Sequence, residues 1–414
     1  MTVRTVTVEL LRAGPRHNQL VSPTTQYLGV CGNSPAGRVT LPYEHGDLER
    51  LLQALRYRET VEGDPLRSAK VLDRLGRDVA QVLAAVPGLA GALNDEDERP
   101  QALTHLRIVL SASELALLPF EATKLPQGDG AESTWLALKV RNPACVTRHI
   151  RSVSATGLRW PVKPRLLFVA GPDTPAETHR QALAAALQPW RSTHGSVDDL
   201  LTVLTGSTQA TVAGITRAVR DAVQAGRPYT HVHLLAHGVP FDAFDRYSAI
   251  GLQLHDDAPV GGDRLATALS AMGANGMHRP TVVTLAACES GQVGDVRSTH
   301  ASMAHELHDQ GIALVVASQF PLSVAGSVPF VERFYGGQWW GEHPLVSLLN
   351  VRQHLHSLLG GENHDWASLV AYEAFPADLP DQLDEVGYWQ ARRAHDLALQ
   401  RLEGAAGAAP EDWQ

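Results

Sequence analysis

The chain has 414 residues, 44% of them hydrophobic, and a formal net charge of −9 at pH 7. That negative charge, without any cluster of Lys and Arg, argues against a protein that neutralises many nucleic-acid phosphates. No apolar run approaches the ~20 residues of a membrane-spanning helix, and no signal-peptide pattern opens the sequence, so we expect a cytoplasmic protein without a membrane partner.

The N-terminal third mixes strand and helix patterns. Strand patterns occur at residues 5–10 (TVTVEL), 106–110 (LRIVL) and 135–140 (WLALKV). Leucines repeat with helical spacing over 47–57, and leucines and valines do so over 72–83. We therefore expect a small α/β lobe over residues 1–159.

From about Trp160 onward the pattern becomes alternating strands and helices. Unbroken apolar runs, typical of parallel strands covered on both faces, occur in RLLFVAG, LLTVL, HVHLLA, TVVTLAA and GIALVVAS. Helical patterns lie between and after them, at 175–187, 211–223, 324–359 and 388–402. The sequence predicts an α/β fold with a mostly parallel sheet flanked by helices over residues 160–404, followed by a disordered tail at 405–414.

Two of these runs end on residues that can do chemistry. HVHLLAHG ends on His237 and Gly238, and TLAACESG carries Cys288, 51 residues after the histidine (288 − 237). Functional groups gather at the carboxyl ends of strands in open parallel sheets. A histidine about 50 residues before the nucleophile is also the spacing found in caspases.

The pairing of a thiol with an imidazole suits nucleophilic catalysis. The imidazole accepts the thiol proton or, when protonated, lowers the thiol pKa, and it later protonates the leaving amine. The backbone N–H groups of Gly238 and Cys288 are candidates for an oxyanion hole. Cys31 and Cys145 have no such context, and three scattered cysteines argue against a disulfide framework, so we interpret those two as structural.

The blocks VHLLAHG, TLAACESG, GIALVVASQFP and FVERFYGG resemble the CHAT domain, a caspase-like cysteine peptidase of clan CD. The resemblance covers about residues 165–373. ELALLPFEATKLP and LALKVRNPACVTR in the N-terminal third also resemble, more loosely, the lobe that precedes the peptidase lobe in such proteins, a candidate for a degenerate caspase-like half. One departure is ASQFP, where the family commonly has tryptophan before the proline and this chain has Phe320.

The resemblance implies a catalytic dyad of His237 and Cys288, with Gly238 in the oxyanion hole and no cofactor. It also implies a bacterial defence or regulated cell-death role, in which one or a few protein substrates are cut, a gasdermin or another defence protein among them. Such enzymes are often held inactive, so we expect a separate activator or sensor protein. The segment 241–248 (FDAFDRYS) is the candidate for a mobile, activation-dependent loop.

Two acids are candidates for substrate binding. Asp173 follows the strand RLLFVAG, and Asp295 lies seven residues after Cys288, the offset at which the related metacaspases carry an aspartate that holds a basic side chain. Carboxylates facing an arginine make charge-assisted contacts. The hypothesis is cleavage after Arg, with Lys second; the alternative is that both acids are solvated loop residues.

Other histidines have structural interpretations. In HASMAHELH only His305 and His308 share a helical face, and without the glutamate of a zinc-peptidase motif we expect a solvated or interfacial cluster and no metal site. His231 and His233 alternate along a strand and are expected in the core. The sequence thus favours a cysteine endopeptidase; a catalytically silent peptide-binding scaffold and a cysteine-dependent acyltransferase remain as alternatives.

Overall fold

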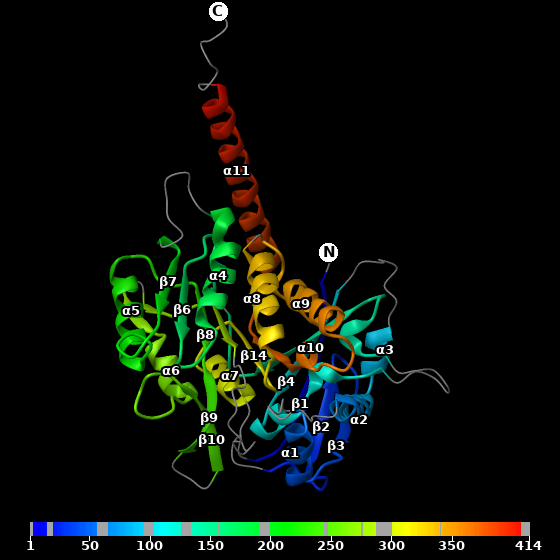
Figure 1. The fold of residues 1–414 in the computed structure, drawn as a ribbon. Helices are drawn as coiled ribbons and strands as arrows, with labels where there is room; N and C mark the ends of the chain where they lie inside the picture. Colours follow the sequence, from blue (N-terminus) through cyan, green and yellow to red (C-terminus); the bar gives the residue numbers. More distant parts are fainter. Residues whose placement is uncertain are drawn as a thin grey trace, which may run out of the picture.

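Apolar segments that are far apart in the sequence lie side by side in one sheet of the computed structural model (Figure 1). The structure describes residues 3–14, 20–55, 65–94, 103–125, 134–155, 157–190, 199–243, 247–274, 276–286, 300–339 and 341–406. The strands of this sheet are β1 (Val3–Leu11), β2 (Gln26–Cys31), β3 (Gly37–Thr40), β4 (Leu103–Leu110), β5 (Ala144–Ile150), β6 (Leu166–Ala170), β7 (Leu201–Leu204), β8 (His231–Leu235), β13 (Val282–Ala286), β14 (Leu314–Ser318) and β15 (Leu369–Glu373).

Most strands of the sheet belong to two parallel blocks that run in opposite directions, and β2 and β3 add an antiparallel extension beyond β1. Its order is β3-β2-β1-β4-β5-β15-β14-β13-β8-β6-β7. Strands β1, β4, β5 and β15 are mutually parallel, as are β14, β13, β8, β6 and β7, and the direction reverses at the antiparallel pair of β14 and β15. The carboxyl ends of the two blocks therefore lie at opposite edges of the sheet. The mixed α/β fold with a mostly parallel sheet, predicted from the apolar runs, is confirmed.

Helices cover both faces of the sheet. Those of the C-terminal part are α4 (Ala176–Leu187), α5 (Val212–Gln224), α6 (Gly262–Ala268), α7 (His300–Asp309), α8 (Val324–Gln338), α9 (Pro344–Leu359), α10 (Asp365–Ser368) and α11 (Leu379–Ala406). Those of the N-terminal part are α1 (His45–Gln53), α2 (Pro65–Ala84) and α3 (Leu89–Asn94), with 3₁₀ turns η1 (Ser113–Leu117), η2 (Phe120–Ala122) and η3 (Leu136–Leu138). Another 3₁₀ turn, η4 (Gln188–Trp190), follows α4. On one face, α8 packs against both α4 and α9. On the other face, α6 packs against both α5 and α7.

Buried charged groups join the two blocks. Arg148 of β5 is fully buried and donates to both carboxylate oxygens of Glu121, at 3.0 and 2.5 Å, and to Oε1 of Gln319 at 2.7 Å. Arg107 of β4 donates to both oxygens of the buried Glu373 at 2.5 and 2.8 Å. A buried charge is tolerated only when it is paired and hydrogen-bonded, so these contacts fix β4 to β15 and β5 to the residue that follows β14. The sheet is thus continuous across the boundary expected near residue 160, and the division into lobes stays a prediction.

Two predicted elements differ in the structure. Residues 135–140 were expected to form a strand, but the segment forms the short turn η3, whose hydrogen bond from Leu138 N to Trp135 O closes it locally. Segment 241–248 was expected to be a loop, but its described residues belong to β9 (His237–Ala243) and β10 (Tyr247–Gln253), an antiparallel hairpin. A second, smaller hairpin joins β11 (Ala271–Gly273) and β12 (Gly276–His278). Of the tail expected at 405–414, all but the first two residues lie outside the described part of the chain.

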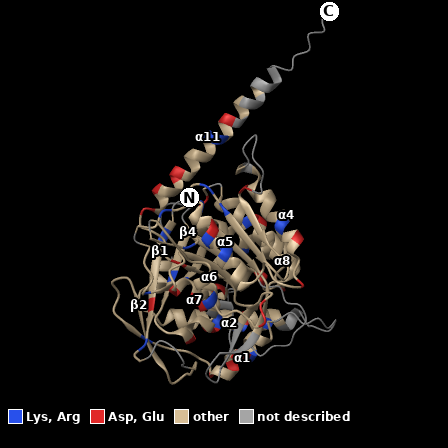
Figure 2. Cartoon of the chain, turned by 90° about the vertical axis from the view of Figure 1, so that its left-hand side faces the viewer, with Lys and Arg blue, Asp and Glu red and all other residues tan. Residues whose placement is uncertain are grey.

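Three further features concern the last helix, the distribution of charged residues and the character of the helices. Helix α11 runs out from the body of the molecule (Figure 1). Acidic and basic residues are interspersed along α4, α5 and α11 (Figure 2). None of the helices in the described part of the chain combines the length and the apolar character that a membrane crossing requires.

Candidate active site

His237 lies at the carboxyl edge of the block that contains β8. The five residues of β8 are all buried, which anchors the chain in the sheet up to Leu235, and His237 is the first residue of β9. Its side chain is almost fully enclosed, with the residue 9% exposed. The hairpin base packs tightly on β6, because the carbonyl of Gln253 approaches Gly171 so closely that any Cβ there would collide with it. A buried run followed by a tight packing contact therefore fixes the imidazole at this edge.

The main-chain carbonyl of Asp173 orients the imidazole. Nε2 of His237 lies 3.1 Å from that oxygen, and since a carbonyl only accepts, Nε2 is the protonated nitrogen of the neutral ring. Nδ1 then carries the lone pair and is the nitrogen that can accept a proton. Asp173 presents its carbonyl from a left-handed backbone conformation with φ of 55°, uncommon for any residue but glycine and tolerated best by Asn and Asp.

The turn around Asp173 is well held. It lies between two prolines, Pro172 and Pro175, and the hydroxyl of Thr174 donates to the carbonyl of Gly171 at 2.9 Å. An uncommon backbone conformation persists only where the surroundings determine it, and such positions cluster at functional sites. The Asp173 side chain is exposed at the same edge as His237.

The orientation of the Gly238 backbone follows from the hydrogen bonds of its hairpin. It lies opposite Leu252 in the β9–β10 hairpin. Both backbone groups of Leu252 bond to Val260, at 3.0 and 2.9 Å, and so point away from β9. The pair is therefore a non-hydrogen-bonded one of the antiparallel ladder, and the N–H of Gly238 points away from β10.

The strand register relates His237 to the position of Cys288. Strands β8 and β13 pair in parallel from His231↔Val282 to Leu235↔Ala286, a constant offset of 51 residues. His237 and Cys288 have the same offset, so each lies two residues beyond the last registered pair. Cys288 itself lies outside the described residues, as does Asp295. The structure therefore describes His237, Gly238 and Asp173 together at one edge, and leaves the other two predicted residues as predictions.

The other cysteines and histidines named from the sequence, Cys31, Cys145, His231, His233, His305 and His308, are buried. Burial raises the pKa of the Cys31 thiol, and that of Cys145 to about 11, so both are poor nucleophiles at neutral pH. His231 and His233 lie in the core as predicted. A solvated setting for His305 and His308 is wrong: both are buried against the ring of Tyr372, because α7 covers β15. Within the described residues, no group of three or more His, Cys, Asp or Glu side chains is arranged to hold a metal ion.

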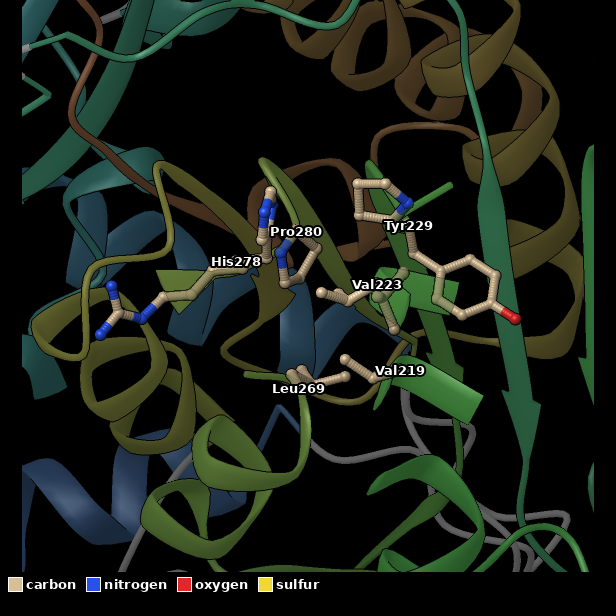
Figure 3. A pocket seen from close by; sticks show the side chains of 9 residues that line it. Val219, Val223, Tyr229, Leu269, His278 and Pro280 are labelled. Carbon is tan, nitrogen blue, oxygen red and sulfur yellow. The ribbon is translucent and has the colours of Figure 1, made fainter. Parts of the chain in front are cut away.

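A shallow apolar pocket lies away from this edge (Figure 3). It has a volume of about 220 Å³, including space open to solvent, and side chains such as Val219, Tyr229, Leu269 and Pro280 line it. Tyr229 and Pro280 precede β8 and β13, so the pocket is at the amino ends of these strands. It is not part of the candidate active site.

Sequence reasoning missed two contributions to the site. The Asp173 carbonyl is a backbone group, and only the flanking prolines indicate that its conformation is fixed. The second is the side-chain contact of His179, near the start of α4, with His233 of β8, which no sequence spacing indicates.

Comparison with known proteins identifies the class. The model of the CHAT domain matches residues 73–374, most of the chain, and the chain belongs to this family of caspase-like proteases and their relatives. Among curated proteins, none matches this sequence.

Among solved structures, this chain is similar to two of the separase–securin complex from Saccharomyces cerevisiae. They are 9% and 8% identical to this chain, with TM-scores of 0.48 and 0.44. Each alignment covers 89% of this chain and 30% of the other, so this chain spans under a third of the length of the protein it matches.

Proposed function

We propose that the protein is a cysteine endopeptidase in which Cys288 is the nucleophile and His237 the general base. The observation that carries this proposal is an offset of 51 residues. Paired residues of β8 and β13 are 51 positions apart in the sequence, and so are His237 and Cys288. The two side chains then follow neighbouring parallel strands at equal distance. Family membership and the carbonyl of Asp173 on Nε2 of His237 support it.

In the proposed reaction, Nδ1 of His237 takes the thiol proton and the Cys288 thiolate attacks the scissile carbonyl carbon. The N–H groups of Gly238 and Cys288 stabilise the oxyanion. The C–N bond breaks as His237 returns the proton to the leaving amine, and a thioester remains. Water, deprotonated by His237, then hydrolyses the thioester and restores the thiol.

The proposed specificity is for Arg before the scissile bond, with Lys second. Asp173 and Asp295 are the proposed partners of the basic side chain. The exposed Asp173 side chain at the edge that carries His237 supports this assignment. The proposed setting is bacterial defence or regulated cell death, with a gasdermin or another defence protein as substrate and a separate sensor protein as activator.

The test is covalent labelling with an acyloxymethyl ketone that carries arginine next to the warhead, read by intact mass. We expect one adduct on the wild type, none on Cys288→Ala and a strongly slowed reaction on His237→Ala. The same reagent with leucine in place of arginine is the matched control for specificity. An adduct that persists on Cys288→Ala would refute the assignment of the nucleophile, and labelling by the leucine reagent alone would refute the basic pocket.

A further inference from the structure

A continuous chain of buried hydrogen bonds lies beneath the candidate active site. Nδ1 of His179 contacts Nε2 of His233 at 3.0 Å, and Nε2 of His179 contacts the hydroxyl of Ser327 at 3.1 Å. On the other side, Nδ1 of His233 contacts the hydroxyl of Thr284 at 2.6 Å, which in turn contacts that of Tyr335 at 2.6 Å. All five residues are fully buried, so the chain links α4, β8, β13 and α8 inside the protein.

Burial favours the neutral form of both imidazoles in this chain. One proton lies between the two histidines, and each ring has one donor and one acceptor nitrogen when neutral. Burial lowers the pKa of His179 to about 4 and that of His233 well below its usual value, in keeping with this arrangement.

The chain connects the same two segments that meet at the active-site edge. Asp173 precedes His179 by six residues, and His233 precedes His237 by four. The two segments therefore touch twice: at the edge, where the Asp173 carbonyl accepts from His237, and beneath it, where His179 meets His233. The rings of His179 and His233 lie nearly parallel, with centroids 5.3 Å apart, as expected for two imidazoles joined edge to edge by a hydrogen bond.

We propose that His179 is a positioning residue for His237: its bond to His233 clamps segment 173–179 onto segment 233–237 and so holds the Asp173 carbonyl over the catalytic imidazole. This inference rests on the proposed function. Without the clamp, α4 and the turn before it can shift relative to β8, and a shift of a few tenths of an ångström at a hydrogen bond changes the orientation of His237. The chain continues through Thr284 to Tyr335, but that part lies outside the clamp.

The pH dependence of Cys288 alkylation by iodoacetamide, followed by intact mass, tests this clamp. A thiolate paired with an imidazolium reacts at a pH well below the ordinary thiol pKa of about 8.5. In His179→Phe we expect the midpoint of the rate profile to rise by about one pH unit, which means roughly tenfold less thiolate below the midpoint. Tyr335→Phe is the matched control, since it removes a buried hydroxyl from the same chain but leaves both contacts between the segments; its midpoint should stay at the wild-type value.

The outcomes separate the clamp from the dyad. If His237→Ala leaves the alkylation profile unchanged, the proposed function itself fails. If His237→Ala shifts it but His179→Phe does not, the dyad stands and the clamp is refuted. An equal shift in His179→Phe and Tyr335→Phe would mean a general loosening of the core and would also overturn the clamp. Should His179→Phe not fold, Ser327→Ala, which removes the hydroxyl that contacts Nε2 of His179 and the carbonyl of Val324, carries the test, with a smaller shift in the same direction.

Discussion

The two parallel blocks of the sheet place buried polar groups differently. In the N-terminal block, Arg148 pairs with Glu121 and Arg107 with Glu373, and Arg148 also binds Gln319, which follows β14 of the other block. In the C-terminal block, the polar chain of His179 and His233 leads toward an edge where His237, Gly238 and Asp173 lie together. The same architecture therefore supports two uses of polar residues: holding strands together, and presenting groups for chemistry. Function is expected where the polar side chains reach the end of a strand.

The sharpest test of this difference compares one buried histidine from each block. His237→Gln is expected to slow labelling by the arginine reagent about 10²- to 10⁴-fold, the usual contribution of a general acid–base group, with little change in melting temperature. His105→Gln disturbs the contact of His105 with Thr147 in the N-terminal block. This variant is expected to lower the melting temperature and to leave the labelling rate near that of the wild type. Labelling rates and thermal unfolding of both variants check this, and equal activity losses would remove the contrast between the blocks.

Breaking the buried ion pair of the N-terminal block should cost the most stability. Glu121→Gln leaves the Arg148 guanidinium buried without its counter-charge, and we expect the free energy of unfolding to fall by about 3–5 kcal/mol. Asp47→Asn is the control, because its partner Arg50 is solvent-exposed and no measurable change is expected. Urea unfolding of the three proteins measures the effect. A loss no larger than that of the control would mean that water or rearrangement compensates the buried charge.

Acid should unfold both blocks together. Burial lowers the pKa of His105 to about 4 in one block and that of His231 to about 3 in the other. An unfolded histidine takes up a proton near its ordinary pKa of about 6.5. Between about pH 6.5 and pH 4 the unfolded state therefore binds more protons than the folded state. As the pH is lowered through this range, the free energy of unfolding falls by up to about 1.4 kcal/mol per pH unit for each such group. Urea midpoints measured from neutral to acidic pH should fall steadily, and tryptophan fluorescence and far-UV circular dichroism should give coincident transitions. Two separated transitions would show that the blocks unfold independently.

Substitutions at Asp173 separate the role of its carbonyl from that of its carboxylate. Asp173→Val forces a β-branched residue into the left-handed conformation, and we expect about 1–2 kcal/mol of destabilisation with a slower reaction of Cys288 toward every reagent. Asp173→Asn keeps the conformation and should reduce labelling only by the arginine reagent, if the carboxylate binds substrate. Equal loss with the arginine and leucine reagents in Asp173→Asn would refute the substrate-binding role.

The sequence predicted the strands of the C-terminal block well, because β6, β13 and β14 are almost entirely apolar and β8 interrupts its apolar run only with two buried histidines. It missed β5, whose buried Arg148 and Thr147 resemble a surface segment until their partners Glu121 and His105 are known. The hairpin of β9 and β10 was mistaken for a loop, since FDAFDRYS lacks the regular alternation of a half-buried strand. The position of His237 at a strand end could be predicted because a strand end is a local signal, whereas that of Cys288 stays a prediction. The clamp of His179 could not, because it depends on which helix packs over which strand.

The place of β15 in the sheet has a consequence for how the chain is made. This strand comes near the C-terminal end of the described chain, at residues 369–373, yet it lies between β14 and β5, whose sequences are separated by more than 160 residues. During synthesis, β5 and β14 each present an unpaired edge until β15 leaves the ribosome and is inserted between them. Sheet closure is therefore among the last events of folding, and a chain released before residue 369 would expose two strands prone to aggregation.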